Sequence, residues 1–399
     1  MSPGRLQETL CAKDLVDQVT ASIQRHESRL MEINKKIHDN PELRYQEFQA
    51  HDNICTLMES LGYSVTRHAH GLETSFQVEY GCEGRVVVFN AEYDALPGIG
   101  HACGHNLIAT SSIASFIATA EAMRRSNAIG RVRLLGTPAE ESGGGKIKLI
   151  TAGAYRDVDA CLMSHPGPAA VTGSSSPKVF DGIAATRSLA RKKVNVTFRG
   201  KNAHAGLNPW DGTNALDAVV SSYVNISLLR QQMSPTARVH GVVRNGGAEP
   251  NLIPDVAGLE YFAGATASGC TVECVWDKES DYKDLRPNMT LARIFTRCIS
   301  RIGRTYLEDG RDITMGASTD MGNVCYELPS FHGVFSVGSE IPGASPHSPD
   351  FAAAAASETA FKLAMDCAKG MAMTAYEILT NEATSDQAWD EFKTEFAVR

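Results

Sequence analysis

Val86-Val-Val-Phe-Asn-Ala-Glu-Tyr-Asp94 decides the fold of this chain, because an apolar run, Val86 to Phe89, is followed within five residues by two carboxylates. The same order recurs where Val132-Arg-Leu-Leu135 precedes Glu140-Glu141, and where Ala160-Cys-Leu-Met163 precedes His165. Apolar runs buried on both faces are typical of parallel strands, and open α/β sheets bind ligands at the carboxyl ends of their strands. The three runs therefore predict one sheet edge that carries all of these polar side chains.

The rest of the chain indicates two domains, since 399 residues exceed what one ordinary core supports. Helical and strand patterns alternate from about residue 48 to 165 and resume after Asn288, which is typical of a doubly wound, mainly parallel α/β sheet. Between them, a Ser-rich stretch at 173–177 leads into a block with its own strand and helix spacing. We predict a discontinuous α/β domain of residues 1–186 and 287–399, with a smaller α+β domain of residues 187–286 inserted into it.

Hydrophobic periodicity assigns the individual elements. Helices are expected at 14–35, 106–125, 147–152, 214–231 and 290–302, with a single closing helix at 351–380. Further strands are expected at 193–199, 239–243, 259–262, 271–276 and 333–338. Asn106 is the candidate N-cap of the helix that follows the first polar motif.

Composition argues against several classes of protein. The chain is 43% apolar and 21% charged, as in soluble globular proteins, and its formal charge of −8 argues against a nucleic-acid partner. No stretch approaches the roughly 20 apolar residues that span a bilayer, and residues 1–17 lack the apolar segment of a secretory signal. The ten cysteines are scattered without a paired framework, so we expect reduced thiols. These features predict a cytoplasmic protein without membrane or nucleic-acid partners.

A thiol, imidazoles and carboxylates converge on the predicted sheet edge. Cys103 and His105 flank one glycine and can bind an ion from a tight turn, while Glu141 and His165 follow two further strands. This donor set suits zinc, with manganese or cobalt possible where carboxylates predominate. Singly, each residue is better explained as a buried cysteine or a satisfied histidine. Their joint placement at strand ends is what indicates a metal site.

Glu140 and Glu141 are adjacent, so their side chains diverge in an extended or turning segment. One carboxylate can bind metal while the other faces a metal-bound water, whose pKa falls toward ~7 on zinc. That second carboxylate can relay the proton of the water to a leaving amine. A solvated acidic pair is the alternative, which the apolar strand immediately upstream disfavours. Asp94 is a candidate to orient a metal-binding histidine.

Seven longer segments extend these motifs into a resemblance that covers about residues 30 to 380. They are Ala91–Pro97, Gly100–Ile108, Gly136–Lys146, His165–Gly167, Pro209–Asp217, Arg238–Gly241 and Gly316–Val324. Together they resemble the amidohydrolase branch of the aminoacylase/carboxypeptidase metallopeptidases, and most of all its β-alanyl-lysine (Xaa-Arg) dipeptidase subgroup. The resemblance implies a metal-dependent amidohydrolase acting on a dipeptide or N-acyl amino acid, a small-molecule amide.

The resemblance also implies roles for individual residues. It implies two divalent metal ions per subunit, held by Cys103, His105, Glu141, His165 and His347. Glu140 is then the general base. The inserted domain is implied to be a truncated ferredoxin-like lid that forms a homodimer. In it, His204 stabilises the oxyanion across the subunit interface and Asn251 binds substrate, although His204 can also be read as an exposed turn histidine.

The chain departs from the family at the lid. The lid strand usually ends in Arg-Ala and is followed by a helix, whereas here Leu259-Glu-Tyr-Phe-Ala-Gly264 runs almost directly into Ala267-Ser-Gly-Cys-Thr-Val-Glu273. Gly264 thus stands where an arginine would bind a carboxylate bidentately, which weakens the case for a substrate with a free α-carboxylate. A parallel crossover takes about a dozen residues or more, so we expect the flanking strands to form a hairpin or to re-pair.

Two other functions stay open at this point. One is a catalytically impaired relative that serves as a binding partner, which the damaged lid favours. The other is a biosynthetic enzyme that cleaves or forms an amide on a specialised metabolite lacking the usual carboxylate. The complete set of predicted ligands and the base favour an active enzyme over the binding partner.

Overall fold

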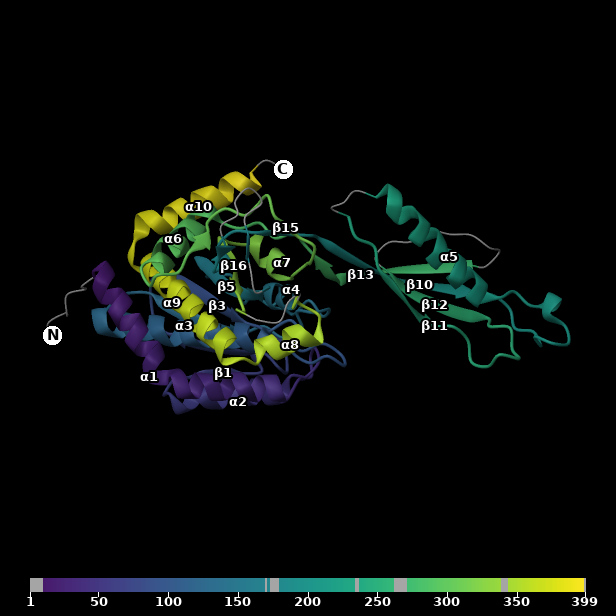
Figure 1. Ribbon diagram of the computed structural model, residues 1–399, viewed down its shortest axis with the longest axis horizontal. Coiled ribbons are helices and arrows are strands. Elements are labelled where there is room, and N and C mark those ends of the chain that lie inside the picture. Colours follow the sequence, from purple (N-terminus) through teal and green to yellow (C-terminus); the bar gives the residue numbers. More distant parts are fainter. Residues whose placement is uncertain are drawn as a thin grey trace. The chain divides into compact units, whose positions relative to one another are not determined.

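The computed structural model describes residues 10–168, 171–172, 179–233, 237–261, 271–338 and 344–397, and the chain divides into two compact units (Figure 1). Unit 1 comprises Met1–Ser188, Asp284–Met315 and Thr319–Arg399, and unit 2 comprises Leu189–Lys283 with Gly316–Ser318. Whether these units act as a catalytic domain and a lid or dimerisation domain stays a prediction. Among the described residues, no helix combines the length and the apolar character needed to cross a bilayer.

Unit 1 is built on an eight-stranded sheet in the order β1-β2-β4-β3-β5-β16-β8-β14. Its centre consists of the parallel neighbours β4 (Arg131–Gly136), β3 (Val86–Ala91), β5 (Ala160–Gly167) and β16 (Ser330–Ser336). Short strands form the edges: β1 (Val65–Arg67), β2 (Phe76–Tyr80), β8 (Gly182–Ile183) and β14 (Tyr306–Leu307). The predicted mainly parallel α/β sheet is confirmed.

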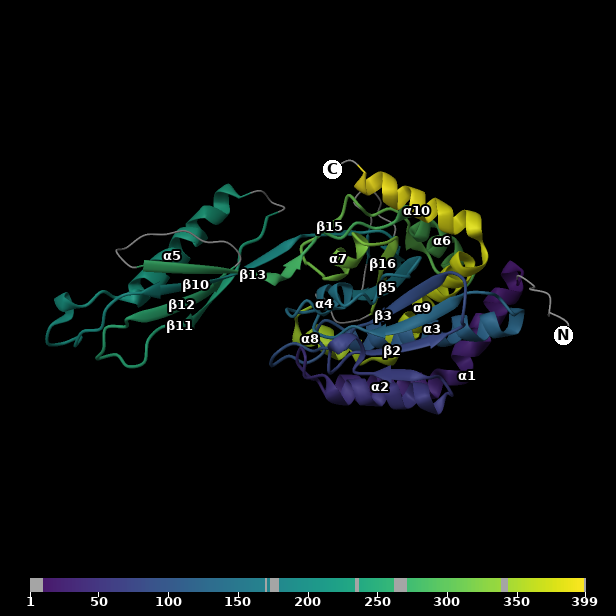
Figure 2. The same cartoon turned by 180° about the vertical axis from the view of Figure 1, so that it is seen from behind.

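Helices cover both faces of this sheet, which is why its central strands read as continuous apolar runs. In β3, Val87 and Phe89 join the core formed with α1 (Ala12–Asp39), α3 (His105–Ser126), α6 (Met289–Ser300) and α9 (Glu358–Thr380). Val86 and Val88 instead join the opposite core, formed with α4 (Gly145–Thr151) and α7 (Met321–Cys325). In both views α2 (Phe48–Ser60) lies along α1 (Figures 1 and 2).

The remaining elements of unit 1 are short or terminal. They are η1 (Ala69–Gly71), β6 (Val171–Thr172), β7 (Val179–Phe180), β9 (Arg187–Ser188), β15 (Thr314–Met315), α8 (Pro349–Ala355) and α10 (Glu382–Phe396).

The predicted N-cap of α3 is wrong. The helix begins at His105, and Gly104 (φ 77°) occupies the cap in the left-handed conformation that glycine tolerates. A side chain at Gly104 would also clash with Pro166. Asn106 lies inside the helix, where its buried amide donates to Asn34 Oδ1 (2.9 Å) and to the Ala355 carbonyl (3.0 Å). The glycine therefore lets the helix begin earlier than the side-chain pattern indicates.

The single closing helix predicted at 351–380 is also wrong, because two helices occupy that range. α8 ends at Ala355, and the Ser357 hydroxyl accepts from the Ala360 N–H (3.1 Å) to begin α9. A serine in N-cap position interrupts a continuous alanine-rich pattern that contains no proline or glycine between 350 and 369.

Unit 2 is a four-stranded antiparallel sheet with one described α-helix. The sheet has the order β11 (Gly241–Asn245), β12 (Val256–Tyr261), β10 (Arg191–Arg199) and β13 (Thr271–Tyr282). Val194, Val196 and Phe198 of β10 pack against α5 (Ala215–Leu229), which Asn214 caps. The short turns η2 (Pro209–Asp211) and η3 (Arg230–Gln232) complete the unit. This arrangement is the predicted α+β, ferredoxin-like type.

The hairpin, one of the two arrangements expected for β12 and β13, does not form, because both strands pair antiparallel with β10, one on each side. β12 ends with Tyr261 opposite Val194, and β13 begins with Thr271 opposite Arg199. Tyr261 and Thr271 therefore lie about 17 Å apart along β10 and two strand spacings, ~10 Å, apart across the sheet. Gly264 and its neighbours lie outside the described residues.

Candidate metal centre

The carboxyl edge of the sheet in unit 1 collects the predicted metal-binding side chains. Three groups have ligand atoms that all lie within 4.8 Å of one another. These groups are Cys103 with His105 and His165, Cys103 with Glu141 and His347, and Glu92 with His105 and Glu140. All five predicted ligands and the predicted base therefore come together in unit 1; the strand-end rule led us to expect this for all of them except His347, which the resemblance implied. Their roles as ligands and base stay predictions.

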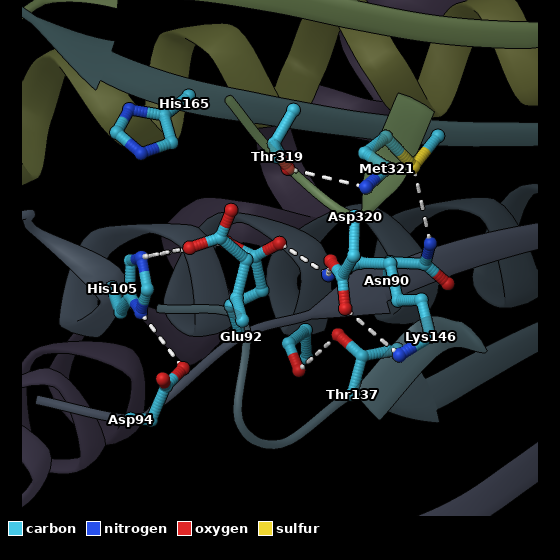
Figure 3. Close-up of polar contacts among 12 residues, drawn as sticks. Asn90, Glu92, Asp94, His105, Thr137, Lys146, His165, Thr319, Asp320 and Met321 are labelled. Atoms are coloured by element: carbon cyan, nitrogen blue, oxygen red, sulfur yellow. Dashed lines mark hydrogen bonds and ion pairs between the residues drawn. The ribbon is translucent and has the colours of Figure 1, made fainter. Parts of the chain in front are cut away.

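His105 lies at the centre of these groups. Its Nδ1 lies 3.0 Å from Asp94 Oδ1, and its Nε2 faces Glu92 Oε2 at 3.5 Å (Figure 3). A carboxylate on Nδ1 holds the proton there and leaves the Nε2 lone pair for a metal ion. Burial alone would lower the pKa of His105, but Asp94 and the Cys103 thiol outweigh burial and raise that pKa well above its usual value. The surroundings of His105 thus favour positive charge on or beside its ring.

His165 is placed by its own backbone neighbour. Its Nδ1 donates to the Pro166 carbonyl (2.7 Å), which leaves Nε2 available 3.4 Å from Cys103 Sγ. Burial and the neighbouring His105 lower the pKa of His165, so the ring is held in the neutral form that binds metals.

His347 reaches the same edge from the segment after β16. Its N–H donates to the Ala102 carbonyl (2.8 Å), and its Nε2 lies 3.4 Å from Glu141 Oε1. The backbone of His347 is left-handed (φ 68°), a conformation that non-glycine residues rarely adopt. Pairing with Glu141 raises the pKa of His347, and the same contact, with His105, lowers the pKa of Glu141 against the effect of burial.

The turn that presents Glu140 and Glu141 is held by two buried carboxylates. Glu47 Oε1 accepts from the Ala139 N–H (2.9 Å), and Asp94 Oδ2 accepts from the Glu141 N–H (3.0 Å). Burial raises the pKa of Glu140 well above its usual value, and the like charges of neighbouring carboxylates raise it further. A carboxylate with a raised pKa suits the role of general base. Sequence reasoning missed Glu47, since nothing in its local pattern distinguishes it from a solvated helix-start glutamate.

Sequence reasoning also missed a buried charge cluster beside the centre. Lys146 Nζ contacts Glu92 Oε1 (2.5 Å) and Asp320 Oδ1 (2.7 Å), and all three side chains are fully buried (Figure 3). Glu92 and Lys146 lie within the family motifs, but the sequence pattern assigned them no role. Two sequence features could have indicated a role. Glu92 follows the same predicted strand as Asp94, and Lys146 directly follows three glycines after the next predicted strand.

The residues present fit divalent metal ions. His105 Nε2 and Glu92 Oε2 are fully buried and, among the residues that the structure describes, have no hydrogen-bond partner. A cation between such atoms satisfies both, and a set of thiol, imidazole and carboxylate donors suits zinc.

His204 and Asn251, the predicted oxyanion and substrate residues, lie in unit 2. The unit brings them together: the Ala205 N–H donates to the Asn251 carbonyl (2.9 Å). His204 Nδ1 accepts from the N–H groups of Gly206 and Leu207 (3.1 Å each), and both predicted residues are exposed. Their functional roles stay predictions.

A mainly parallel α/β sheet with thiol, imidazole and carboxylate donors at its carboxyl edge defines the class of metallohydrolases. Residues 88–370 match peptidase family M20/M25/M40, and the chain belongs to this family. The resemblance noted in the sequence is thereby confirmed, as is the assignment to hydrolytic metalloenzymes.

Relatives within the family support a dipeptidase or acylase type. The chain is 36% identical to the Xaa-Arg dipeptidase of Mus musculus, over 92% of this chain and 89% of the relative. It is 30% identical to a p-aminobenzoyl-glutamate hydrolase chain of Escherichia coli, over 71% of this chain and 64% of that one. These relatives do not favour the binding-partner and biosynthetic alternatives.

Solved structures share the fold. A dinuclear metal-binding peptidase of the M20 family from Bacillus subtilis aligns with a TM-score of 0.58 at 20% identity, covering 89% of this chain and 99% of that one. An aminobenzoyl-glutamate utilization protein from Klebsiella pneumoniae aligns with a TM-score of 0.62 at 15% identity, covering 92% and 99%.

Proposed function

We propose that this protein is a metal-dependent amidohydrolase that cleaves the amide bond of a dipeptide or N-acyl amino acid. The observation that carries the proposal is the surroundings of His105. Asp94 fixes one ring nitrogen, and Glu92, Glu140 and Glu141 face the other within 3.9 Å. The similarity to the Xaa-Arg dipeptidases supports the substrate class.

The metal-holding residues are proposed to be Cys103, His105, Glu141, His165 and His347, with two divalent ions per subunit. When bound, such ions polarise a carbonyl and lower the pKa of water. Zinc is the proposed metal because of the thiol and imidazole donors, with manganese or cobalt as alternatives. The dinuclear metal-binding peptidase that shares the fold supports the count of two.

The protein residues then move one proton. Glu140 accepts the proton of the attacking water and returns it to the nitrogen of the leaving amine. Asp94 keeps His105 in one tautomer throughout, since its oxygen lies 3.0 Å from Nδ1. His204 is proposed to stabilise the developing negative charge of the carbonyl oxygen, and Asn251 to bind the substrate.

We further propose that the protein is a cytoplasmic homodimer. The ten cysteines, scattered without a paired framework and expected to be reduced, support the compartment. The likeness of unit 2 to a ferredoxin-like dimerisation domain supports the assembly.

Metal removal and reloading test the function. The protein stripped with a chelator should lose all hydrolysis of dipeptides and N-acyl amino acids, and regain it with Zn²⁺, Mn²⁺ or Co²⁺. A screen of both substrate classes at each metal identifies the substrate. Protein that binds two ions and hydrolyses no member of either class would contradict the proposal and favour the binding-partner alternative.

A further inference from the structure

Among the described residues, a buried cluster of charged side chains beside the candidate metal centre has no role in the proposed mechanism. Glu92 follows β3, Lys146 is the second residue of α4, and Asp320 precedes α7. Lys146 Nζ lies 2.5 Å from Glu92 Oε1 and 2.7 Å from Asp320 Oδ1, and no part of the three side chains is exposed (Figure 3). Charged side chains this deeply buried are rare unless they are paired. Here Lys146 pairs with one carboxylate oxygen of Glu92, and the other oxygen has no hydrogen-bond partner among the described residues.

The lysine is fixed at both ends by the same aspartate. Asp320 Oδ1 accepts from Lys146 Nζ, and Asp320 Oδ2 accepts from the Lys146 N–H (2.9 Å). Lys146 is therefore held at its backbone and at its ammonium group, and cannot turn away from Glu92. The lysine in turn fixes one carboxylate oxygen of Glu92, which determines the direction of the other.

That other oxygen, Oε2, points at the metal centre. It lies 3.5 Å from His105 Nε2, and both atoms are buried without a hydrogen-bond partner among the described residues. With Glu140, the two form one of the three groups whose ligand atoms lie within 4.8 Å of one another. A carboxylate oxygen and an imidazole nitrogen that face each other in this way are both typical donors to a divalent cation.

We propose that Glu92 is a further ligand of the metal centre, on the ion that His105 binds, and that Lys146 and Asp320 are its positioning residues. The proposal rests on the proposed function, because it requires a metal centre. The charges agree with the proposal. The Lys146 ammonium group balances the charge of one of the two carboxylates, Glu92 and Asp320, and the second negative charge is left to face a cation.

Metal affinity tests the proposal without reference to activity. Zn²⁺ dissociation constants are measured for the full-length protein by competition with a chromophoric chelator. Glu92→Gln should weaken one of two ions by about 100-fold or more, since losing a supporting residue outside the ligand set alone costs about 10–100-fold. Asp320→Asn, which loosens the lysine, should weaken the same ion by about 10-fold. Glu79→Gln, which removes a carboxylate paired with Arg133 in β4, is the matched control and should change neither ion.

Direct structure determination separates a ligand from a supporting residue and needs no variant. In the crystal structure of the Zn²⁺-loaded wild-type protein, Glu92 Oε2 should lie about 2.0–2.2 Å from an ion. A separation beyond about 3 Å from both ions, or unchanged affinity of both ions in Glu92→Gln, overturns the proposal. If Glu92 proves not to be a ligand but the wild-type protein binds two ions and hydrolyses its substrate, the proposed function still holds. Wild-type protein that binds no ion would contradict both the Glu92 proposal and the proposed function.

Discussion

Ala139 has a left-handed backbone (φ 61°) although it carries a side chain, and it directly precedes the two glutamates of the candidate centre. Such conformations cost of order 1–3 kcal/mol and persist where surrounding contacts hold them. Here Glu47 accepts from the Ala139 N–H, and Thr74 donates its hydroxyl to the second oxygen of Glu47 (2.8 Å). One buried glutamate thus fixes the turn from which Glu140 projects.

Glu47→Gln should flatten the dependence of stability on pH. Burial, and then the like charge of Asp94, raise the pKa of Glu47 to about 7, above its usual 4.5. The folded state therefore binds more protons than the unfolded state between pH ~4.5 and ~7, so stability falls as pH rises through this window. The full penalty of about 3 kcal/mol is present above it.

Glutamine can preserve the contacts to Ala139 and Thr74, since its oxygen can accept from the Ala139 N–H and its amide can donate to the Thr74 hydroxyl. Urea unfolding of the metal-free wild type and variant at pH 5 and pH 8 measures the difference. The variant should gain about 2.5 kcal/mol relative to the wild type between these values, since a small part of the penalty is already present at pH 5. Equal pH dependence of the two proteins would show that Glu47 is not a buried, titrating carboxylate.

Much of the candidate site could be predicted residue by residue, because ligands bind at the carboxyl ends of the strands in an open α/β sheet. Cys103, His105, Glu141 and His165 were located because polar residues follow apolar runs. Glu47 was not, because it comes from a helix start 92 residues before its partner Ala139, and a long-range contact leaves no local pattern.

At the scale of elements, the central strands β3, β4 and β5 were located by their apolar runs, whereas the short strands β1, β2, β8 and β14 were not predicted. Two-sided burial gives β3, β4 and β5 an apolar signature that few other segments share. The bounds of α3 and the break before α9 depend on single cap residues, Gly104 and Ser357, whose effect comes from backbone geometry and one hydrogen bond. Tertiary packing decides between several equally good caps, which periodicity cannot do.

The departure from the family pattern at Gly264 leads to a prediction about substrates. If Gly264 replaces a carboxylate-binding arginine, substrates with a free α-carboxylate lose about 2–4 kcal/mol of binding, since charged hydrogen bonds contribute ~1.5–3 kcal/mol each and are not fully additive. That corresponds to roughly 30- to 700-fold in kcat/KM. Blocking the carboxylate as an amide should then cost little more.

Paired kcat/KM values for the free acid and the amide of one acyl substrate measure this. A strong preference for the free acid would mean that another cation, such as Arg238 or Lys201, binds the carboxylate.

At the scale of the whole molecule, the prediction is a homodimer formed by unit 2. The outer face of α5 exposes Val220, Tyr223, Val224 and Leu228 at helical spacing, an apolar stripe of the kind that marks an interface. Light scattering should give twice the mass of 43.0 kDa. Val224→Glu with Leu228→Glu should give monomers, while Ile129→Glu, at an exposed apolar site in unit 1, should not.

Activity adds a second readout. The monomeric variant should also lose hydrolysis, because His204 is predicted to serve the site of the other protomer. A monomer with full activity would remove both the dimer and this role.

The central claim is that Glu140 acts as the base of a metal centre without holding the metal. Glu140→Ala, assayed for turnover and for metal ions per protomer on the same sample, tests it most directly. Glu140→Ala should lose at least about 10²–10⁴-fold in kcat with both ions retained, whereas Cys103→Ala and His165→Ala should lose metal together with rate. A Glu140→Ala protein that binds two ions and turns over at the wild-type rate would contradict it.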